Sequence, residues 1–264
     1  MAGFLYIGAG LGMGVIAIIR KVKRTSEKEE KICEKDLPYV MGMILLDVIA
    51  PICLLLGLKY TSAANASLLN NFEIVATAII ALMIFKEKIS KRLWLGIIFV
   101  VMSCLLLSIE DISSLQFSSG SLFIILACIC WGFENNCTRT LSSKDPLQIV
   151  LLKGIFSGLG SLIIGFIIGE KIIHIWSVFA VLLVGFIAYG LSIFFYVYAQ
   201  RKLGAARTSA YYAVAPFIGT LLSLIIFQEL PKYTYFIALF LMLIGAWLCA
   251  SDKPLFNKEK IKDK

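Results

Sequence analysis

The sequence has few of the residues from which catalytic and metal sites are usually built. Its 264 residues include one histidine, His174, in a short connection where it is expected to face water, and charged residues make up only 16%. The seven cysteines lie mostly inside apolar runs without CxxC or Cys/His ligand spacing, and there is no HExxH pattern. The sequence therefore predicts no metal site and no cofactor, and it argues against an enzyme.

A basic face of the kind that binds nucleic acid is also missing. The formal net charge is +8, but the basic residues occur in short clusters between apolar runs. Clusters in such positions are typical of membrane topology signals rather than of a nucleic-acid surface. We therefore expect no nucleic-acid partner.

Apolar sequence is what the chain has in abundance. Hydrophobic residues make up 59% and the mean hydropathy is +0.89, well above the values of soluble proteins. Runs of about 17 to 25 apolar residues are each long enough to cross a bilayer. They lie at residues 2–20, 39–58, 63–85, 93–109, 121–139, 148–168, 176–200, 207–228 and 232–250. We predict an all-α polytopic protein with about nine transmembrane helices, surrounded by lipid in the cytoplasmic membrane.

The connections between these runs alternate in charge. The first, third, fifth and seventh connections and the C-terminal tail hold 21 of the 25 Lys and Arg residues, the alternate connections hold three, and Lys153 lies inside a helix. Cytoplasmic loops carry an excess of Lys and Arg. The pattern predicts a cytoplasmic C-terminus, with a basic tail over 252–264, and, for nine crossings, an N-terminus outside.

One stretch of the chain, residues 62–87, is repeated without a gap 142 residues later as 204–229. Both copies begin with small residues and end in Phe-x-Glu, at Glu87 and Glu229, which we interpret as stops at the membrane interface. The copies lie five crossings apart and therefore run in opposite directions. Inverted repeats of this kind are typical of secondary transporters, whose solute path lies between them near the bilayer midplane.

This symmetry divides the chain into a first half, residues 1–112, and a second half, residues 113–251, followed by the tail. The fifth apolar run has a counterpart in the first half only at positions before Met1. We therefore expect one N-terminal helix of a ten-helix plan to be missing. A protein of nine helices with its N-terminus outside is the alternative.

Several strings in the sequence carry a likeness to a known family. They are LKYTSAANASLLNN with FKEKIS, the second copy's FQELP, Trp131 with Gly132, and Lys153 with Gly154 after Asp145 and Pro146. Together they resemble the EamA family of the drug/metabolite transporter superfamily over nearly the whole chain. The resemblance implies ten helices in two inverted five-helix repeats, with both ends cytoplasmic, and transport of small metabolites, amino acids or toxic compounds. The sequence departs from the family in having Ile74 after Glu73, where members often have proline.

Carboxylates in the middle of the predicted helices are the first candidates for function, since an intramembrane charge is costly. Asp47 lies near the middle of the second run and Glu73 near the middle of the third, so we expect both at similar depth. Asn70, Glu73 and Thr77 share one helical face at spacings of three and seven. Their alternative role is to hold helices together by hydrogen bonds.

The aligned positions of the second copy offer an aromatic wall. They include Tyr212, which follows Tyr211. A carboxylate and an amide facing tyrosines would suit a solute with a cationic amine and an apolar part.

A second candidate cluster lies in the fifth run. Trp131, Glu134 and Asn135 lie on one face of this helix, at spacings of three and four. Lys153, in the next helix, is expected at a similar depth in the membrane, so Glu134 and Lys153 are expected to pair. The pair could serve as a gate or as a clamp for a substrate carboxylate. The alternatives are that it is a structural ion pair, or that Lys153 extends to the lipid headgroups instead. We favour a structural role for Lys153 and a functional one for the two midplane carboxylates.

Two prolines, Pro51 and Pro216, fall inside predicted helices. Each frees a carbonyl and permits a bend. Such a kink is either part of a rocking motion or a static feature.

These observations predict a secondary transporter that moves a small metabolite, amino acid or drug-like compound by alternating access between two inverted repeats. Proton coupling through a midplane carboxylate is a further hypothesis. The alternatives are a non-transporting partner subunit or an inactive fragment, and, less favoured, an intramembrane enzyme built on Asp47 and Glu73.

Overall fold

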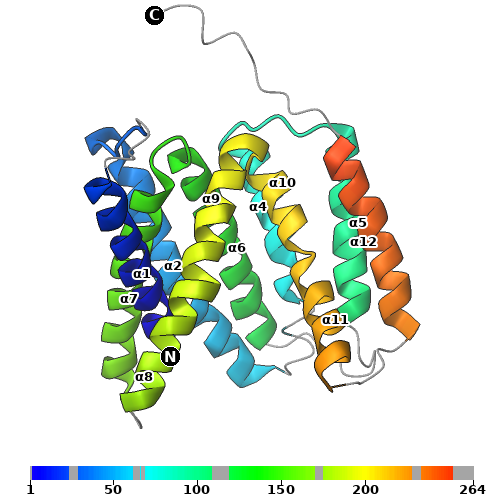
Figure 1. Ribbon diagram of the computed structural model, residues 1–264. Coiled ribbons are helices and arrows are strands. Elements are labelled where there is room, and N and C mark those ends of the chain that lie inside the picture. Colours follow the sequence, from blue (N-terminus) through cyan, green and yellow to red (C-terminus); the bar gives the residue numbers. More distant parts are fainter. Residues whose placement is uncertain are drawn as a thin grey trace, which may run out of the picture.

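The computed structural model is a bundle of α-helices that run up and down side by side (Figure 1). It describes residues 2–23, 29–61, 66, 69–108, 119–169, 175–227 and 233–251. The elements are α1 (Ala2–Val22), the 3-10 turn η1 (Glu34–Asp36), α2 (Leu37–Tyr60), α4 (Phe72–Met83), α5 (Lys91–Ser108), α6 (Ser119–Leu141), α7 (Pro146–Ile168), α8 (Ile175–Val184), the π-helical segment η3 (Gly185–Leu191), α9 (Ser192–Leu203), α10 (Ala205–Tyr212), α11 (Ala215–Phe227) and α12 (Tyr233–Ser251). Across these ranges there is no strand, and the predicted all-α class is confirmed.

Some features singled out in the sequence lie outside the described residues. These are His174, Glu229, the basic tail and the first residues of the repeated stretch, 62–65.

Six helical spans within the described ranges are long and apolar enough to cross a membrane: Gly3–Val22, Glu34–Tyr60, Ser119–Leu141, Pro146–Ile168, Trp176–Leu203 and Tyr233–Ser251. α4, with 12 residues, is a shorter apolar helix. Trp176 and Tyr233, the first residues of two of these spans, are each 79% exposed, a position in which aromatic side chains suit the membrane–water interface. The predicted polytopic membrane architecture is confirmed.

Glycines bring the helices into close contact. A Cβ atom added to Gly154 of α7 would lie 2.4 Å from the backbone nitrogen of Gly10 in α1. On the other side of the bundle, a Cβ atom on Gly245 of α12 would lie 2.9 Å from the carbonyl oxygen of Gly96 in α5. Helix association in lipid depends on such close packing, because burial of apolar surface gives little driving force there.

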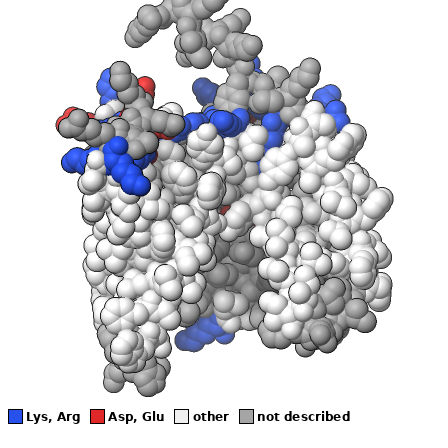
Figure 2. All heavy atoms as spheres, viewed as in Figure 1, with Lys and Arg blue, Asp and Glu red and all other residues white. Residues whose placement is uncertain are grey.

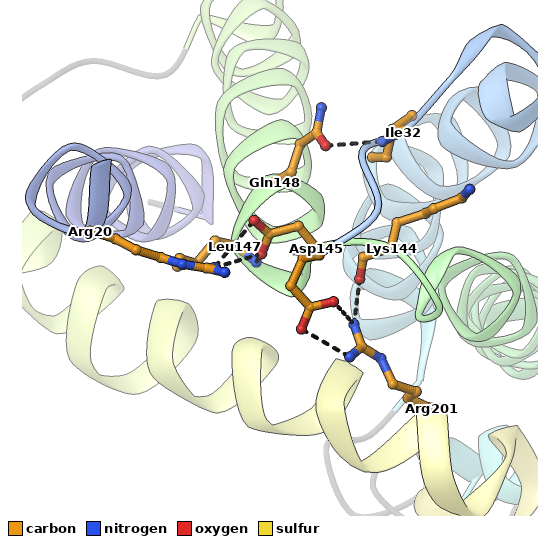
Figure 3. A network of polar contacts seen from close by, with 8 residues as sticks. Arg20, Ile32, Lys144, Asp145, Leu147, Gln148 and Arg201 are labelled. Carbon is orange, nitrogen blue, oxygen red and sulfur yellow. Dashed lines mark hydrogen bonds and ion pairs between the residues drawn. The ribbon is translucent and has the colours of Figure 1, made fainter. Parts of the chain in front are cut away.

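Lysines and arginines gather at one end of the molecule, called the basic end below (Figure 2). Here the guanidinium of Arg201, in the last turn of α9, forms two hydrogen bonds of 3.1 Å to Glu29 and one of 2.6 Å to the carbonyl oxygen of Lys144 (Figure 3). Arg20 of α1 pairs with Asp145 at 3.2 Å, and Asp145 also caps the first turn of α7. These contacts tie the ends of α1, α7 and α9 together.

Lys144, in the connection between α6 and α7 at this end, favours its charged form. The hydrogen bond from Lys144 to Glu30 raises the pKa of Lys144. Lys144 Nζ also lies 3.7 Å from Asp36 Oδ2. The raised pKa favours the charged ammonium group, so we expect the pair of Lys144 with Glu30 to persist across the neutral pH range.

Glu87 links the two halves of the chain at the basic end. Its Oε2 atom accepts a hydrogen bond of 3.1 Å from the backbone N–H of Ala205, the first residue of α10. This close approach of Glu87 to α10 requires glycine at position 204, before Ala205. A Cβ atom on Gly204, whose φ is +86°, would lie 2.1 Å from Glu87 Oε1. A carboxylate at a helix N-terminus satisfies an unpaired N–H and complements the helix dipole. The predicted stop at the interface is therefore also a cap on the opposite half.

We expect Glu87→Ala to cost about 1 kcal/mol of stability, because it removes this cap. Thermal unfolding in detergent should show a lower midpoint for Glu87→Ala than for the parent. Glu87→Gln, which keeps an acceptor oxygen but loses the charge, should fall between them. An unchanged midpoint for Glu87→Ala would show that the contact contributes nothing.

The third predicted helix, over 63–85, is not continuous. Helix is present at 66, 69 and 70, a turn follows at Asn71, and α4 begins at Phe72, so Glu73 lies in the first turn of α4 and not near the middle of a helix as predicted. Asparagine side chains compete with helical hydrogen bonds by bonding to nearby backbone groups. Asn71, which lies at the turn itself, is therefore well suited to the interruption.

The second copy of the repeated stretch is interrupted at the aligned place. α10 ends at Tyr212 and α11 begins at Ala215, with Pro216 as its second residue. Proline is well suited to the first turn of a helix, where its missing N–H has no partner to lose. Pro216 therefore lies in the first turn of a new helix rather than inside a continuous one, and its part in a bend stays a prediction.

Candidate functional site

A buried group of charges lies where α1, α2, α6 and α7 meet. Lys153 Nζ donates a hydrogen bond of 2.8 Å to Glu134 Oε1 and lies 3.6 Å from Asp47 Oδ2. The hydroxyl of Tyr6 donates to Asp47 Oδ1 at 3.0 Å, and that of Thr138 donates to Glu134 at 2.5 Å. The predicted pairing of Glu134 with Lys153 is present. Because Lys153 is buried against two carboxylates, the alternative that it extends to the headgroups is wrong.

A second polar group is centred on Asn135 and joins α4, α6 and α9. Asn135 Nδ2 donates to Glu73 Oε1 at 3.0 Å and to Thr77 Oγ1 at 3.2 Å. Its Oδ1 accepts from the hydroxyl of Tyr196 at 3.1 Å, and its backbone oxygen accepts from Gln200 Nε2 at 3.0 Å. The Nδ2 and Oδ1 atoms of this amide, together with the backbone oxygen, therefore link Glu73 of α4 to α9.

Helix α6 connects the two groups, since Glu134 and Asn135 are neighbours in the sequence. α4 comes close to α6 at Gly132, where an added Cβ atom would lie 3.0 Å from that of Ala76. Asn136 fixes this contact by donating to the carbonyl oxygen of Thr77 at 3.0 Å. The sequence at this point of α6 thus sets the distance between the carboxylates of the two groups.

Three of the predicted site residues do not join either group within the described residues. Trp131 is half-buried and forms no hydrogen bond with them. Asn70 lies beside Cys128, whose sulfur is 3.6 Å from its carbonyl oxygen, because the chain is interrupted before Glu73. Tyr211 packs on the apolar core around α5 and α12 rather than beside Tyr212.

Tyrosines line the same region from the second half. The rings of Tyr196 and Tyr212 meet edge to face with centroids 5.4 Å apart, and those of Tyr6 and Tyr189 do the same at 5.4 Å. Tyr189 is 37% exposed and Tyr212 is 58% exposed. Tyr189, Tyr196 and Tyr212 thus lie in this region and Tyr211 does not, and their service as an aromatic wall for a solute stays a prediction.

The backbone departs from regular α-helix at each side of this region. Glu73 follows the interruption before α4, Tyr212 precedes the one after α10, and Tyr189 lies in the π-helical segment η3. Pro51 lies within α2, and because it has no N–H, the carbonyl of Asp47 four residues earlier loses its helical donor. Interrupted helices in corresponding places of two halves, and π-helical turns, are frequent at functional sites.

Reasoning from the sequence missed Tyr6, Tyr189, Tyr196 and Gln200. A signal for three of them was available, because Tyr189, Tyr196 and Gln200 recur at spacings of seven and four on one helical face. Tyr189 is also the residue that follows Asp47 by 142 positions, the offset of the internal repeat. For Tyr6, 41 residues before its partner Asp47, the sequence holds no comparable signal.

Comparison with known proteins places the whole arrangement in a family. The model of the EamA-like transporter family matches residues 1–109 and 118–251, which is most of the chain. The chain belongs to the EamA-like transporter family. The suspected resemblance is thus confirmed, and the protein is a membrane transporter, a class that is generally not enzymatic.

Individual relatives agree with this assignment. An "Uncharacterized transporter" of Methanothermobacter thermautotrophicus is 26% identical, over 94% of this chain and 76% of its own length. The "Uncharacterized transporter YyaM" of Bacillus subtilis is 26% identical, over 63% of this chain and 58% of its own. Protein LicB of Haemophilus influenzae is 31% identical over 44% of this chain and 41% of its own.

A solved crystal structure shows the same fold. It superposes with a TM-score of 0.78 over 93% of this chain and 84% of that chain, at 14% sequence identity.

Proposed function

We propose that this EamA-like protein is a secondary transporter that moves a small solute across the cytoplasmic membrane by alternating access. The two halves, residues 1–112 and 113–251, act as inverted repeats, and the solute binds between them, at Glu73, Asn135 and the tyrosines. The observation that carries the proposal is that both copies of the repeated stretch are interrupted at aligned positions beside this polar region. In transporters, half-helices of this kind supply the solute site near the midplane.

The contacts at the basic end fit one state of such a cycle. Glu87 caps α10 across the halves, and Arg201 ties α9 to Glu29 and Lys144. We propose that this end faces the cytoplasm, as the charge distribution indicates, and that the contacts form the closed inner side. Opening toward the cytoplasm would then break the Glu87 cap.

Proton coupling forms part of the proposal. Glu73 is the carboxylate suited to it, because Asp47 and Glu134 are both engaged by Lys153, whereas Glu73 has no cationic partner within 4 Å among the described residues.

Solute-driven proton flux in liposomes tests this function. We expect one solute from a panel of amino acids, amines and nucleosides to drive proton movement with the parent and at least tenfold less with folded Glu73→Gln, by analogy with the loss of a charge-assisted site. Glu30→Gln is the matched control, because it makes the same chemical change at a side chain that is 76% exposed at the basic end. Equal flux for parent and Glu73→Gln would remove Glu73 from the mechanism, and no flux for any solute would contradict the transporter proposal.

A further inference from the structure

The charges of the two polar groups do not balance. Among the described side chains, Asp47, Glu134 and Glu73 face a single ammonium group, that of Lys153. Lys153 lies within 4 Å of Asp47 and Glu134 but not of Glu73, whose one hydrogen-bond donor in the described part of the chain is the amide of Asn135. A carboxylate left this way in a low-dielectric interior lacks a positive partner.

The same region holds acceptor oxygens that have no donor. Gln200 is fully buried, and its Oε1 atom has no hydrogen-bond partner in the described structure, while its Nε2 atom is bound to Asn135. Asp47 Oδ2 likewise accepts no hydrogen bond, although Lys153 lies nearby. Buried acceptors are normally satisfied. What the region lacks is therefore both positive charge and N–H donors.

Glu73 is also the accessible member of the three carboxylates. Asp47 is 1% exposed and Glu134 is 4% exposed, whereas Glu73 is partly exposed. In the space-filling view, a small spot of red is visible near the middle of this face of the molecule (Figure 2). Among the three carboxylates, a solute can therefore reach Glu73 most directly.

Aromatic rings complete the surroundings expected for a cation. Tyr196 and Tyr212 meet edge to face at 84°, and Tyr212 remains 58% exposed, so part of its ring is free to contact a solute. The face of an aromatic ring attracts an ammonium group. Tyr196 is tied to Glu73 through Asn135, which keeps ring and carboxylate on the same side of α6.

An anionic solute does not fit these groups. Lys153, the one cation of the region among the described residues, is shared by two carboxylates, and freeing it would leave Asp47 and Glu134 buried and unpaired.

We infer that the transported solute is an organic cation, an amine with an apolar substituent, whose charged nitrogen binds Glu73 and Gln200 Oε1 and whose apolar part rests on Tyr212. The inference rests on the proposed function and specifies its substrate class. Lys153 then serves to hold Asp47 and Glu134 in place rather than to bind the solute.

A series of probes that differ only in charge tests the inference. Phenethylamine, phenethyl alcohol and 3-phenylpropanoate share an apolar ring and present a cation, a neutral group and an anion. Binding to the purified protein in detergent is measured by calorimetry, and uptake is measured in liposomes. We expect the amine to bind at least about tenfold more tightly than the alcohol, as is typical of a desolvated charge pair with an aromatic contact. Glu73→Gln should reduce this preference to less than about threefold.

Tyr212→Ala supplies a second variant that removes no hydrogen bond of the two polar groups described above, although it loses the ring contact with Tyr196. It should weaken binding of both the amine and the alcohol while lowering the unfolding temperature only slightly. If the alcohol or the anion binds as well as the amine, the inference is overturned. The proposed function would survive that result if another panel solute still drove proton flux dependent on Glu73, and it would fail if the folded parent moved none.

Discussion

Lys153→Met is expected to leave little folded protein. The methionine fills a similar volume, but Asp47 and Glu134 lose their cation while remaining buried. Removing one member of a buried ion pair typically costs about 3–5 kcal/mol, because the charge left behind is uncompensated. Size-exclusion profiles and thermal unfolding in detergent should show a large loss of monodisperse protein.

Neutralising the partners should reverse this loss. The triple variant Lys153→Met with Asp47→Asn and Glu134→Gln carries no buried charge at this place, so its stability should return to within about 1–2 kcal/mol of the parent. If Lys153→Met is as stable as the parent, the three charges do not form the network described. If the triple variant is as unstable as the single one, the loss arises from packing instead.

Gly8→Ala is expected to separate α1 from the helix that begins with α8. The added Cβ atom would lie 2.2 Å from the carbonyl oxygen of Leu182, a contact that only a backbone shift can relieve. Overpacking of this kind costs about 1–3 kcal/mol or more. We expect a clear fall in the unfolding temperature, measured in the same detergent.

Gly14→Ala on the same helix is the matched control. Its new Cβ atom would meet nothing closer than Leu151 Cδ1 at 3.6 Å. Alanine is favoured over glycine in a helix by up to about 1 kcal/mol, so this variant should be neutral or slightly more stable. Equal effects of the two substitutions would mean that α1 does not pack on α8 through Gly8.

The membrane fold could be predicted because its causes are local. A run of apolar residues must form a helix in lipid, where each backbone N–H and C=O needs a partner within the same segment. The ends of such runs can therefore be read from charges such as Arg20 and Arg201, which the structure places in last turns. The pairing of Glu134 with Lys153 followed in the same way from depth along two consecutive helices.

The rest of the site depends on contacts that the sequence does not encode locally. Tyr6 bonds to Asp47 because glycines let α1 pack deeply in the bundle, and Tyr196 reaches Asn135 from a helix 61 residues away. The predicted position of Glu73, near the middle of a helix, was wrong for a different reason. An unbroken apolar pattern suggested an unbroken helix, whereas the chain turns at Asn71 before α4 begins.

The π-helical segment η3 has a consequence for the rotational phase of the rod formed by α8, η3 and α9. A π-helical turn closes its hydrogen bonds over five residues instead of four, so it contains about one residue more than an α-helical turn. One residue corresponds to about 100° of rotation about the helix axis. Gly185, the first residue of η3, lies against Leu5 of α1. Tyr196, which follows η3 in α9, faces Asn135 of α6. In a regular α-helix, positions 185 and 196 would lie within about 20° of each other around the axis. The extra residue turns these two contact faces apart by most of a right angle, so a single rod packs against one helix and presents its polar groups to another.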